Sequence, residues 1–252
     1  MKKGFLFGFL LLCACATVNP LKEMRFQPVP TMDYTIASWY KITAPGEPLK
    51  VYIEGDGHAF DNKGRPTTDP TPQSTFWREI AANDPSPNVV YLARPCQYMK
   101  SSTCSEQDWT SGRFSAPVID AMDAAVLKLM KKAKTNQVIL VGYSGGAQVA
   151  GLIAVRHPRQ VKKWITVAGV IDYQRWAAWH EDEPLMYSVD LSEYLSEMKG
   201  INQIHYVGTK DTVVPLELTQ KIVTDETLIV PVKGARHNKG YDKIIQQIYD
   251  EQ

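Results

Sequence analysis

The segment QVILVGYSGG, residues 137–146, joins a run of apolar residues to a turn that contains Ser144. The residues that follow, AQVAGLIAVRH (147–157), have the small and aliphatic side chains of a tightly packed helix. A buried strand is therefore expected to turn sharply into a helix at Ser144, where the strained backbone holds the hydroxyl above the sheet. The pattern Gly-x-Ser-x-Gly at 142–146 predicts a serine nucleophile, and the alternative is a structural turn that contains a serine by chance.

Six further runs of β-branched, aromatic and aliphatic residues lie before and after this segment. The later ones are almost continuously apolar, which is typical of strands covered by helices on both faces. Helical patterns fill the gaps between the runs. The sequence therefore predicts an α/β fold with a mostly parallel central sheet and helices on both faces. The expected strands are YTIASWYKI (34–42), LKVYIEG (49–55), NVVYLAR (88–94), QVILVGY (137–143), WITVAGV (164–170), QIHYVG (203–208) and TLIVPV (227–232).

The size and charge of the chain limit its partners. Its 252 residues, of which 44% are hydrophobic, suffice for the core of one α/β domain. Basic and acidic residues number 28 and 27, and no run of Lys or Arg forms a stripe that could follow a phosphate backbone. Nucleic acid is therefore not expected as a partner, and no cofactor or metal site is predicted.

The first sixteen residues, MKKGFLFGFLLLCACA, have the layout of a bacterial secretory signal. Their apolar stretch is too short to span a membrane. Two cleavage sites fit this segment. Leu12-Cys13-Ala14 before Cys15 resembles a lipobox, which would make Cys15 a lipid-carrying first residue, whereas Ala14-Cys15-Ala16 fits ordinary signal cleavage. The first site predicts a lipid-anchored protein on the periplasmic side of the bacterial cell envelope.

The chain is expected to divide into a signal peptide (1–14), a tether (15–33) and a single domain (34–252). Residues 17–33, TVNPLKEMRFQPVPTMD, contain three prolines and no hydrophobic period, as is typical of a linker. Ordered structure is therefore expected to begin near Tyr34.

Export would place the cysteines in an oxidising compartment, where thiols pair. Cys96 and Cys104 are close enough in sequence to close a small loop, and we predict a disulfide between them. In the chain-entropy account, such a loop stabilises a fold by about 2 to 3 kcal/mol. The alternatives are two unrelated free thiols or a metal site, although no ligand spacing surrounds these cysteines.

A serine hydroxyl is a poor nucleophile at neutral pH unless a base accepts its proton, so a histidine is expected beside Ser144. His237 is the best placed, because it follows the last expected strand and precedes the final helical pattern. His58 is the alternative base. The other three histidines fit a helix end, a loop and a packed strand, respectively: His157, His180 and His205.

The base in turn needs a carboxylate that fixes its tautomer and stabilises the imidazolium. Asp211 directly follows the expected strand 203–208. Ser144, Asp211 and His237 each come after a strand, so a parallel sheet would place all three at one edge. Asp172, which follows another strand, is the alternative acid.

Attack on an ester creates a negative oxygen, which requires N–H donors aimed at it. Gly145 is expected to supply one amide because it follows the nucleophile. The glycine-rich turn VYIEGDGH (51–58) is expected to supply the second from Asp56, with Gly57 as the alternative donor. The remaining possibility is a tight turn with no catalytic role.

The side chain of Asp56 raises an electrostatic question, because a carboxylate facing the site would oppose an oxyanion. We therefore expect it to turn away or to pair with a cation such as Arg94 or Lys63.

Several stretches of the chain together resemble the α/β-hydrolase superfamily and, more narrowly, lipobox-bearing bacterial hydrolase-like proteins. They are YIEGDG, DPTP, YLARPCQY, GYSGGA, VGTKDTVVP and GARHNKGY, within residues 51–241. The resemblance implies an eight-stranded sheet with Ser144, Asp211 and His237 as catalytic residues. The turn Glu-Gly-Asp-Gly replaces the His-Gly of many relatives, which leaves the second oxyanion donor open.

Residues 171–200 form an insert where this fold often carries a lid. Its large side chains could wall an acyl pocket or could simply seal the insert onto the sheet, and they are Trp176, Trp179, Met186, Tyr187 and Tyr194. Another part of the pocket rim is expected from the residues after the cysteine loop, Trp109, Arg113 and Phe114.

Two functions are consistent with these residues. The first is a serine hydrolase of carboxylesterase or thioesterase type, which forms an acyl-enzyme on Ser144 and cleaves small acyl esters. Peptidase or acyltransferase chemistry would use the same residues. The second is a non-catalytic envelope protein that keeps the fold to bind a ligand.

Overall fold

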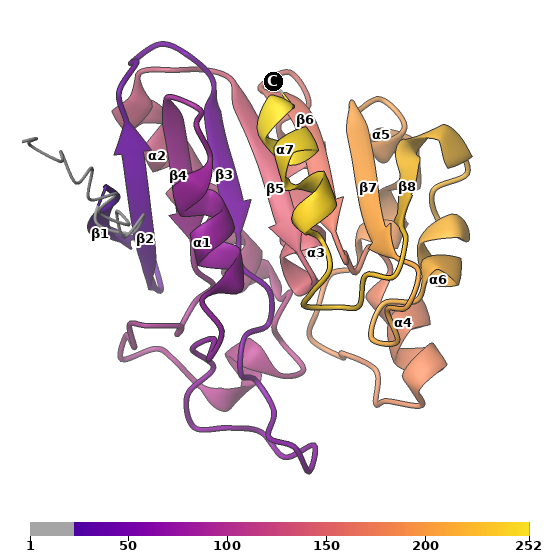
Figure 1. Ribbon diagram of the computed structural model, residues 1–252. Helices are drawn as coiled ribbons and strands as arrows, with labels where there is room; N and C mark the ends of the chain where they lie inside the picture. Colours follow the sequence, from indigo (N-terminus) through magenta and orange to yellow (C-terminus); the bar gives the residue numbers. More distant parts are fainter. Residues whose placement is uncertain (1–22, 252) are drawn as a thin grey trace, which may run out of the picture.

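The computed structural model describes residues 23–251, in which eight strands form one central sheet flanked by helices (Figure 1). All seven predicted strands form, as β2 to β8. The predicted signal peptide and the lipidation residue Cys15 lie outside the described residues. The strands are β1 (Arg25–Pro30), β2 (Thr35–Ile42), β3 (Leu49–Ile53), β4 (Asn88–Leu92), β5 (Val138–Tyr143), β6 (Val161–Val167), β7 (Gln203–Gly208) and β8 (Ile229–Val232).

The order of the strands across the sheet is β1-β2-β4-β3-β5-β6-β7-β8. β1 pairs antiparallel with β2, and β2 pairs antiparallel with β4. All remaining pairs, from β4 to β8, are parallel. The carboxyl ends of β3, β5, β7 and β8 therefore meet at one edge of the sheet, which is where open α/β sheets bind their ligands.

The strand β1 lies inside the segment that we interpreted as a tether, so the ordered fold begins before Tyr34. It pairs with β2, with Arg25 opposite Tyr40 and Pro30 opposite Thr35. Its prolines hid the strand in the sequence, because proline cannot donate a hydrogen bond to a neighbouring strand. β1 is an edge strand, where proline is tolerated.

Helices cover both faces of the sheet, with α1 and α7 on the near face in Figure 1 and α2 and α3 behind it. Each face has its own apolar core. Strands β3 and β4 are fully buried between these layers, which explains their continuous apolar runs. The α-helices are α1 (Phe76–Asn83), α2 (Ala116–Ala133), α3 (Gly145–Arg156), α4 (Tyr173–His180), α5 (Leu195–Met198), α6 (Leu216–Gln220) and α7 (Asp242–Asp250). Short 3-10 helices are η2 (Glu106–Trp109), η3 (Leu191–Tyr194) and η4 (Glu226–Leu228).

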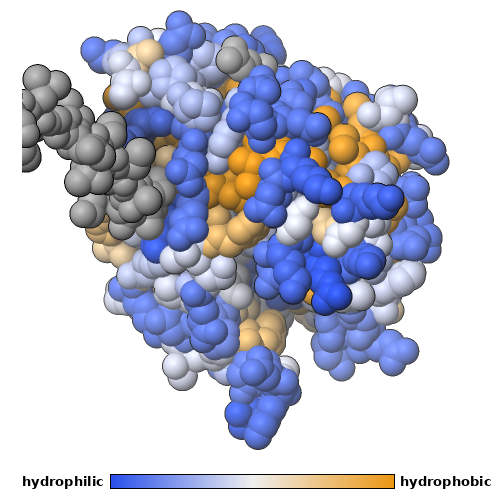
Figure 2. Space-filling model, viewed as in Figure 1, coloured by the Kyte–Doolittle hydropathy of each residue, from blue (hydrophilic) through white to orange (hydrophobic). Residues whose placement is uncertain are grey.

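The near face of the molecule is mostly hydrophilic, and apolar side chains show between the helices over the middle of the sheet (Figure 2). Within residues 23–251, no helix has both the length and the apolar character needed to cross a membrane.

A carboxyl group is buried at the end of β3, where the chain enters the glycine-rich turn. Glu54 is 3% exposed, and its two oxygens accept hydrogen bonds from the amide of Gly55 at 2.8 Å and the hydroxyl of Tyr91 at 2.6 Å. The loss of water raises the pKa of Glu54 to about 7, although these bonds and the charges of Arg78 and Arg94 act in the opposite direction. The turn therefore starts on a side chain whose charge changes near neutral pH.

The predicted disulfide is present and is confirmed by the structure: Cys96 and Cys104 are bonded, with their Cα atoms 5.8 Å apart. It closes the loop that follows β4. Within that loop, Gln97 accepts a hydrogen bond from the amide of Arg94 at 2.9 Å and donates one to the carbonyl of Gly55 at 3.0 Å. The disulfide loop therefore supports the turn after β3.

We predict that Glu54→Gln changes the pH dependence of stability. A carboxyl group whose pKa is higher in the folded than in the unfolded state has no effect on stability at a pH below its unfolded pKa. As the pH rises from the unfolded pKa to the folded pKa, the group destabilises the fold by an increasing amount. For Glu54 this window runs from 4.5 to about 7. Urea unfolding should show the variant gaining stability relative to wild type across that window, by about 3 kcal/mol at most. A difference that stays constant with pH would contradict this account.

We predict that replacing both Cys96 and Cys104 by serine lowers the free energy of unfolding by about 2 to 3 kcal/mol, because the unfolded chain regains the freedom of the open loop. Urea unfolding under oxidising conditions measures the loss. Added reductant should destabilise the wild type to a similar extent and leave the double variant unchanged, which makes that variant its own control.

Candidate active site

Ser144 stands at the sharp turn between β5 and α3, with φ 51° and ψ −125°. Glycine is required on both sides of it. A Cβ atom at Gly142 would lie 2.5 Å from the Cα of Ala147, and one at Gly146 would lie 2.5 Å from the carbonyl oxygen of Ile53. The Gly-x-Ser-x-Gly pattern thus corresponds to a strained turn packed closely against β3 and the start of α3.

His237 lies in the loop between β8 and α7, and its Nε2 is 3.0 Å from the Oγ of Ser144. The ring packs against that of Tyr143, with 5.5 Å between the ring centroids. The hydroxyl of Tyr143 also donates a hydrogen bond to the carbonyl of His237 at 3.2 Å. The imidazole is therefore held within hydrogen-bond reach of the serine hydroxyl.

Asp211 follows β7 and its side chain is completely buried. Its Oδ2 is 3.0 Å from the Nδ1 of His237. Its Oδ1 accepts hydrogen bonds from the amides of Val213 and Val214 at 2.8 and 2.9 Å. A proton on Nδ1 shared with this carboxylate leaves Nε2 available to accept the proton of Ser144. The structure thus brings together the three side chains that the sequence analysis selected.

Two of the other histidines serve the packing of the fold. His205 is buried in β7, where its ring nitrogens bond to Thr166 at 2.9 Å and Gln203 at 3.0 Å. Burial lowers the pKa of His205 to about 3, so that it stays neutral. His157 ends α3 and contacts a carboxylate oxygen of Asp123 at 2.8 Å. Neither residue contributes to the site.

The alternative base and acid are not part of the hydrogen-bonded chain that includes Ser144. His58 lines a cavity next to the serine, whereas the serine hydroxyl bonds to His237. Asp172 caps α4, and its carboxylate accepts the amide of Arg175 at 2.7 Å. The geometry therefore favours His237 and Asp211 for the two roles.

The glycine-rich turn after β3 reaches the same edge of the sheet. A Cβ atom at Gly55 would lie 3.1 Å from the Cβ of Ser144. Among the loop hydrogen bonds of residues 23–251, none is donated by the amide of Asp56 or of Gly57. Gly145 is the first residue of α3, so its amide has no acceptor within the helix. Gly145 and one of the two turn amides can therefore donate to an oxyanion.

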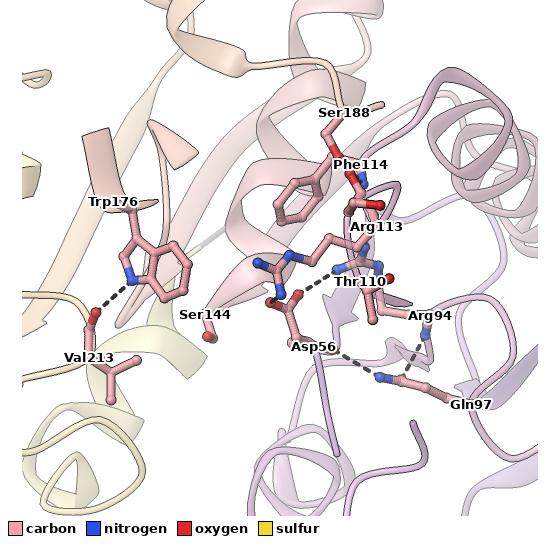
Figure 3. A network of polar contacts seen from close by, with 12 residues as sticks. Asp56, Arg94, Gln97, Thr110, Arg113, Phe114, Ser144, Trp176, Ser188 and Val213 are labelled. Atoms are coloured by element: carbon pink, nitrogen blue, oxygen red, sulfur yellow. Dashed lines mark hydrogen bonds and ion pairs between the residues drawn. The ribbon is translucent and has the colours of Figure 1, made fainter. Parts of the chain in front are cut away.

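The carboxylate of Asp56 lies over Gly145, where a Cβ atom would be 2.1 Å from its Oδ1. Two guanidinium groups hold it, with the Nη1 atom of Arg94 at 3.3 Å from Oδ1 and that of Arg113 at 3.2 Å from Oδ2 (Figure 3). Of the two cations named as partners in the sequence analysis, Arg94 is the one in contact. Arg113, expected only at the rim, is the second partner.

Two cavities meet at Ser144. The first, of about 300 Å³, includes His237, Trp77 and Tyr143 among its walls, and we name it the histidine-side cavity. The second, of about 240 Å³, is the arginine-side cavity, which is lined by Arg113 and by the bulky side chains Phe60, Phe114, Tyr173, Trp176 and Leu185. The turn residues Asp56 and Gly57 line both. A substrate cleaved at Ser144 could place one half in each cavity.

Of the aromatic residues predicted at the pocket rim, Phe114 lines the arginine-side cavity beside Ser144, and so does Trp176. Its Nε1 donates to the carbonyl of Val213 at 2.7 Å, across the cavity from Arg113 (Figure 3). Trp109 is buried below the surface, and Trp179 and Tyr187 are exposed. The prediction was wrong for these three, because aromatic content alone does not tell which side chains face inward.

Among the walls of the arginine-side cavity that the sequence analysis missed are two aromatic residues. Phe60 belongs to the loop after the glycine-rich turn, and Tyr173 begins α4. The hydroxyl of Tyr173 bonds to the carbonyl of Ser188 at 2.8 Å. Neither residue stands in a pattern that distinguishes it from the other aromatic residues of the chain.

Comparisons of the sequence with protein-family models and with curated proteins found no match. Solved structures do resemble it. Est1E from Butyrivibrio proteoclasticus, in a structure with ferulic acid bound, is 12% identical with a TM-score of 0.65, and the alignment covers 89% of this chain and 95% of that one.

Two further structures resemble the chain over most of their length. A thioesterase domain from a curacin biosynthetic pathway is 14% identical with a TM-score of 0.56, covering 90% of this chain and 97% of that one. XC6422 from Xanthomonas campestris, described as an α/β serine hydrolase without a lid, is 12% identical with a TM-score of 0.54, covering 90% and 91%. Together with the sheet order, these likenesses confirm the predicted fold class: the chain has the α/β-hydrolase fold.

Proposed function

We propose that the protein is a serine hydrolase that cleaves acyl esters or thioesters through an acyl-enzyme on Ser144. One observation carries the proposal: an unbroken hydrogen-bonded chain runs from the hydroxyl of Ser144 through His237 to the buried carboxylate of Asp211. Contacts within the fold hold each residue: the amide of Ser144 donates to the carbonyl of Val167, Tyr143 donates to the carbonyl of His237, and two amides donate to Asp211.

In the first half of the reaction, His237 Nε2 takes the proton of Ser144 while Oγ forms a bond to the carbonyl carbon of the ester. The carbonyl oxygen becomes negative and accepts hydrogen bonds from the amides of Gly145 and Asp56. The bond to the leaving oxygen or sulfur then breaks, and the leaving group takes the proton from His237. An acyl-enzyme and a free alcohol or thiol result.

In the second half, a water molecule loses a proton to His237, and its oxygen bonds to the acyl carbon. The ester bond to Ser144 breaks, and the serine oxygen recovers the proton from the imidazolium. The products are a carboxylic acid and the free enzyme. Asp211 remains ionised throughout and stabilises the imidazolium that forms in both halves.

The solved structures support the chemistry in a general way, because they include an esterase, a thioesterase domain and serine hydrolases. The two cavities that meet at Ser144 support a small ester with a modest group on either side of the bond cleaved.

The second candidate is a non-catalytic envelope protein that binds a ligand. The position of Asp56 favours it, because a carboxylate next to the amide of Gly145 would oppose an oxyanion. The contacts of Arg94 and Arg113 with that carboxylate favour the hydrolase, because they offset its negative charge. The two candidates differ in turnover, and the experiment below separates them.

We also propose that the protein is exported and anchored by lipid at Cys15, on the periplasmic side of the cell envelope. The lipobox-like residues before Cys15 support this location. The intact mass of the mature protein tests it, because a diacylglyceryl group on Cys15 and cleavage without lipid give different masses.

We predict that a fluorophosphonate probe labels the wild type and does not label Ser144→Ala, because the probe reacts only with a serine activated by a base. Ser196→Ala is the matched control: Ser196 is exposed, its hydroxyl donates a hydrogen bond to Glu197, and its loss should leave labelling unchanged. Labelling is measured by mass spectrometry of the intact protein. Equal labelling of Ser144→Ala, or none of a folded wild type, would count against the hydrolase proposal.

We predict that Asp211→Asn lowers kcat for p-nitrophenyl butyrate about a thousandfold to ten-thousandfold, because the amide favours the wrong tautomer of His237. The exposed Asp225→Asn is the control and should keep the wild-type rate. A loss of less than tenfold in Asp211→Asn would show that the carboxylate does not orient the base.

A further inference from the structure

We propose that the arginine-side cavity binds an acyl group that ends in a carboxylate, and that Arg113 recognises this carboxylate. The substrates would be esters or thioesters of short dicarboxylic acids with one carboxyl group free. The inference rests on the proposed function, since the acyl group is the one that Ser144 would accept.

The first observation is the unmet hydrogen-bonding capacity of Arg113. Its side chain is 7% exposed, and its Nε is buried without an acceptor. Within residues 23–251 the guanidinium makes one polar contact, at 3.2 Å from Nη1 to Oδ2 of Asp56. A guanidinium carries five N–H donors, and a buried donor without a partner is costly. A ligand that accepts from Arg113 would offset this cost.

The second observation is the balance of charge in the cavity. Asp56 and Arg113 are the charged residues among its lining side chains. The carboxylate of Asp56 is shared with Arg94, which is itself buried and whose Nη2 donates to the carbonyl of Arg113. One carboxylate therefore faces two guanidinium groups, and positive charge is in excess among the groups in direct contact; Glu54, which also interacts with Arg94, is a carboxyl group whose pKa burial raises to about 7. An anionic ligand would complete the balance.

The third observation is the apolar surface around the cation. The Cζ of Arg113 lies 5.8, 5.9 and 5.7 Å from the ring centroids of Phe60, Phe114 and Trp176, respectively. These rings stabilise the guanidinium and keep water from it, which strengthens its attraction for an anion. Methylene groups of a ligand would contact the remaining apolar walls, Val170, Leu185 and Val213. A short aliphatic chain with a charged end fits this lining.

The position of His237 indicates which half of the ester enters this cavity. The leaving group must receive a proton from His237, which lines the histidine-side cavity and not the arginine-side one. The acyl half then occupies the arginine-side cavity. A carboxylate matches the planar fork of one guanidinium, whereas a dianionic phosphate would need a second free cation, and Arg94 is already engaged.

A matched pair of esters tests the proposal: mono-p-nitrophenyl adipate, with a free carboxylate, and its neutral analogue, p-nitrophenyl methyl adipate. For the wild type we expect kcat/KM to be about tenfold to hundredfold higher for the charged ester. Arg113→Gln should lower this ratio to about one or less, while Arg113→Lys should give an intermediate value. Because Arg113 also holds Asp56, the ratio and not the absolute rate is the measure.

Arg156→Gln is the matched control. Arg156 is a half-exposed arginine at the end of α3 that pairs with Asp120, and its loss should leave the ratio at the wild-type value. If Arg113→Gln fails to fold, the ratio of kcat/KM for the charged ester to that for the neutral ester, measured on the wild type alone, still tests the proposal. A wild-type ratio of one or less overturns the proposal.

Binding separates the failure of this inference from that of the proposed function. Calorimetry with adipate, hexanoate and inorganic phosphate requires no turnover, and we expect the wild type to bind adipate more tightly than the other two. Adipate binding without hydrolysis or probe labelling would leave the carboxylate site standing and remove the hydrolase. Hydrolysis of both esters without adipate binding would support the hydrolase and remove the carboxylate site. Tighter binding of phosphate would overturn the assignment to a carboxylate.

Discussion

The hydrogen bond between His237 and Ser144 is the constraint on which the rest of the site depends. It joins two residues that are 93 positions apart in the sequence. Such a contact forms only if the chain returns to the same edge of the sheet after each crossover. The parallel pairing of β5 to β8, with helices covering both faces, meets this requirement and also brings Asp211 behind the ring. The fold thus brings the turns that carry Ser144, Asp211 and His237 together at one edge of the sheet.

The opposite side of the site depends on the turn after β3, and four side chains hold that turn. Glu54 binds the amide of Gly55 from below, and Gln97 binds its carbonyl from the disulfide loop. The two arginines hold the carboxylate of Asp56 from the side of the cavity. None of these side chains belongs to the Ser144 turn, so the amide after β3 that faces an oxyanion is held by contacts of its own, whereas the amide of Gly145 belongs to the Ser144 turn itself.

Six of the seven strands predicted from the sequence were readable because they are buried parallel strands, which are mostly apolar runs, and the antiparallel β2 was readable from its β-branched and aromatic residues. Ser144, Asp211 and His237 were readable because each lies in the turn or loop that follows such a strand. The edge strand β1 was not, since Pro28 and Pro30 removed the donors and the period that mark a strand. The pairing of Arg113 with Asp56 could not be predicted from the sequence. The two residues lie in different loops, and the spacing of residues within one loop does not indicate which other loop contacts it.

The electrostatics of Asp56 connect the catalytic and binding sides of the site. Two unit charges about 4 Å apart interact by about 4 kcal/mol at an effective dielectric constant of 20. A free carboxylate beside the Gly145 amide would therefore cancel most of what an oxyanion donor contributes, about 3 to 4 kcal/mol. One buried arginine would neutralise the carboxylate, and the second makes the surroundings of the oxyanion positive. Two guanidinium groups thus contact the one carboxylate of Asp56, an arrangement that suits a site accommodating negative charge beyond that of Asp56 itself.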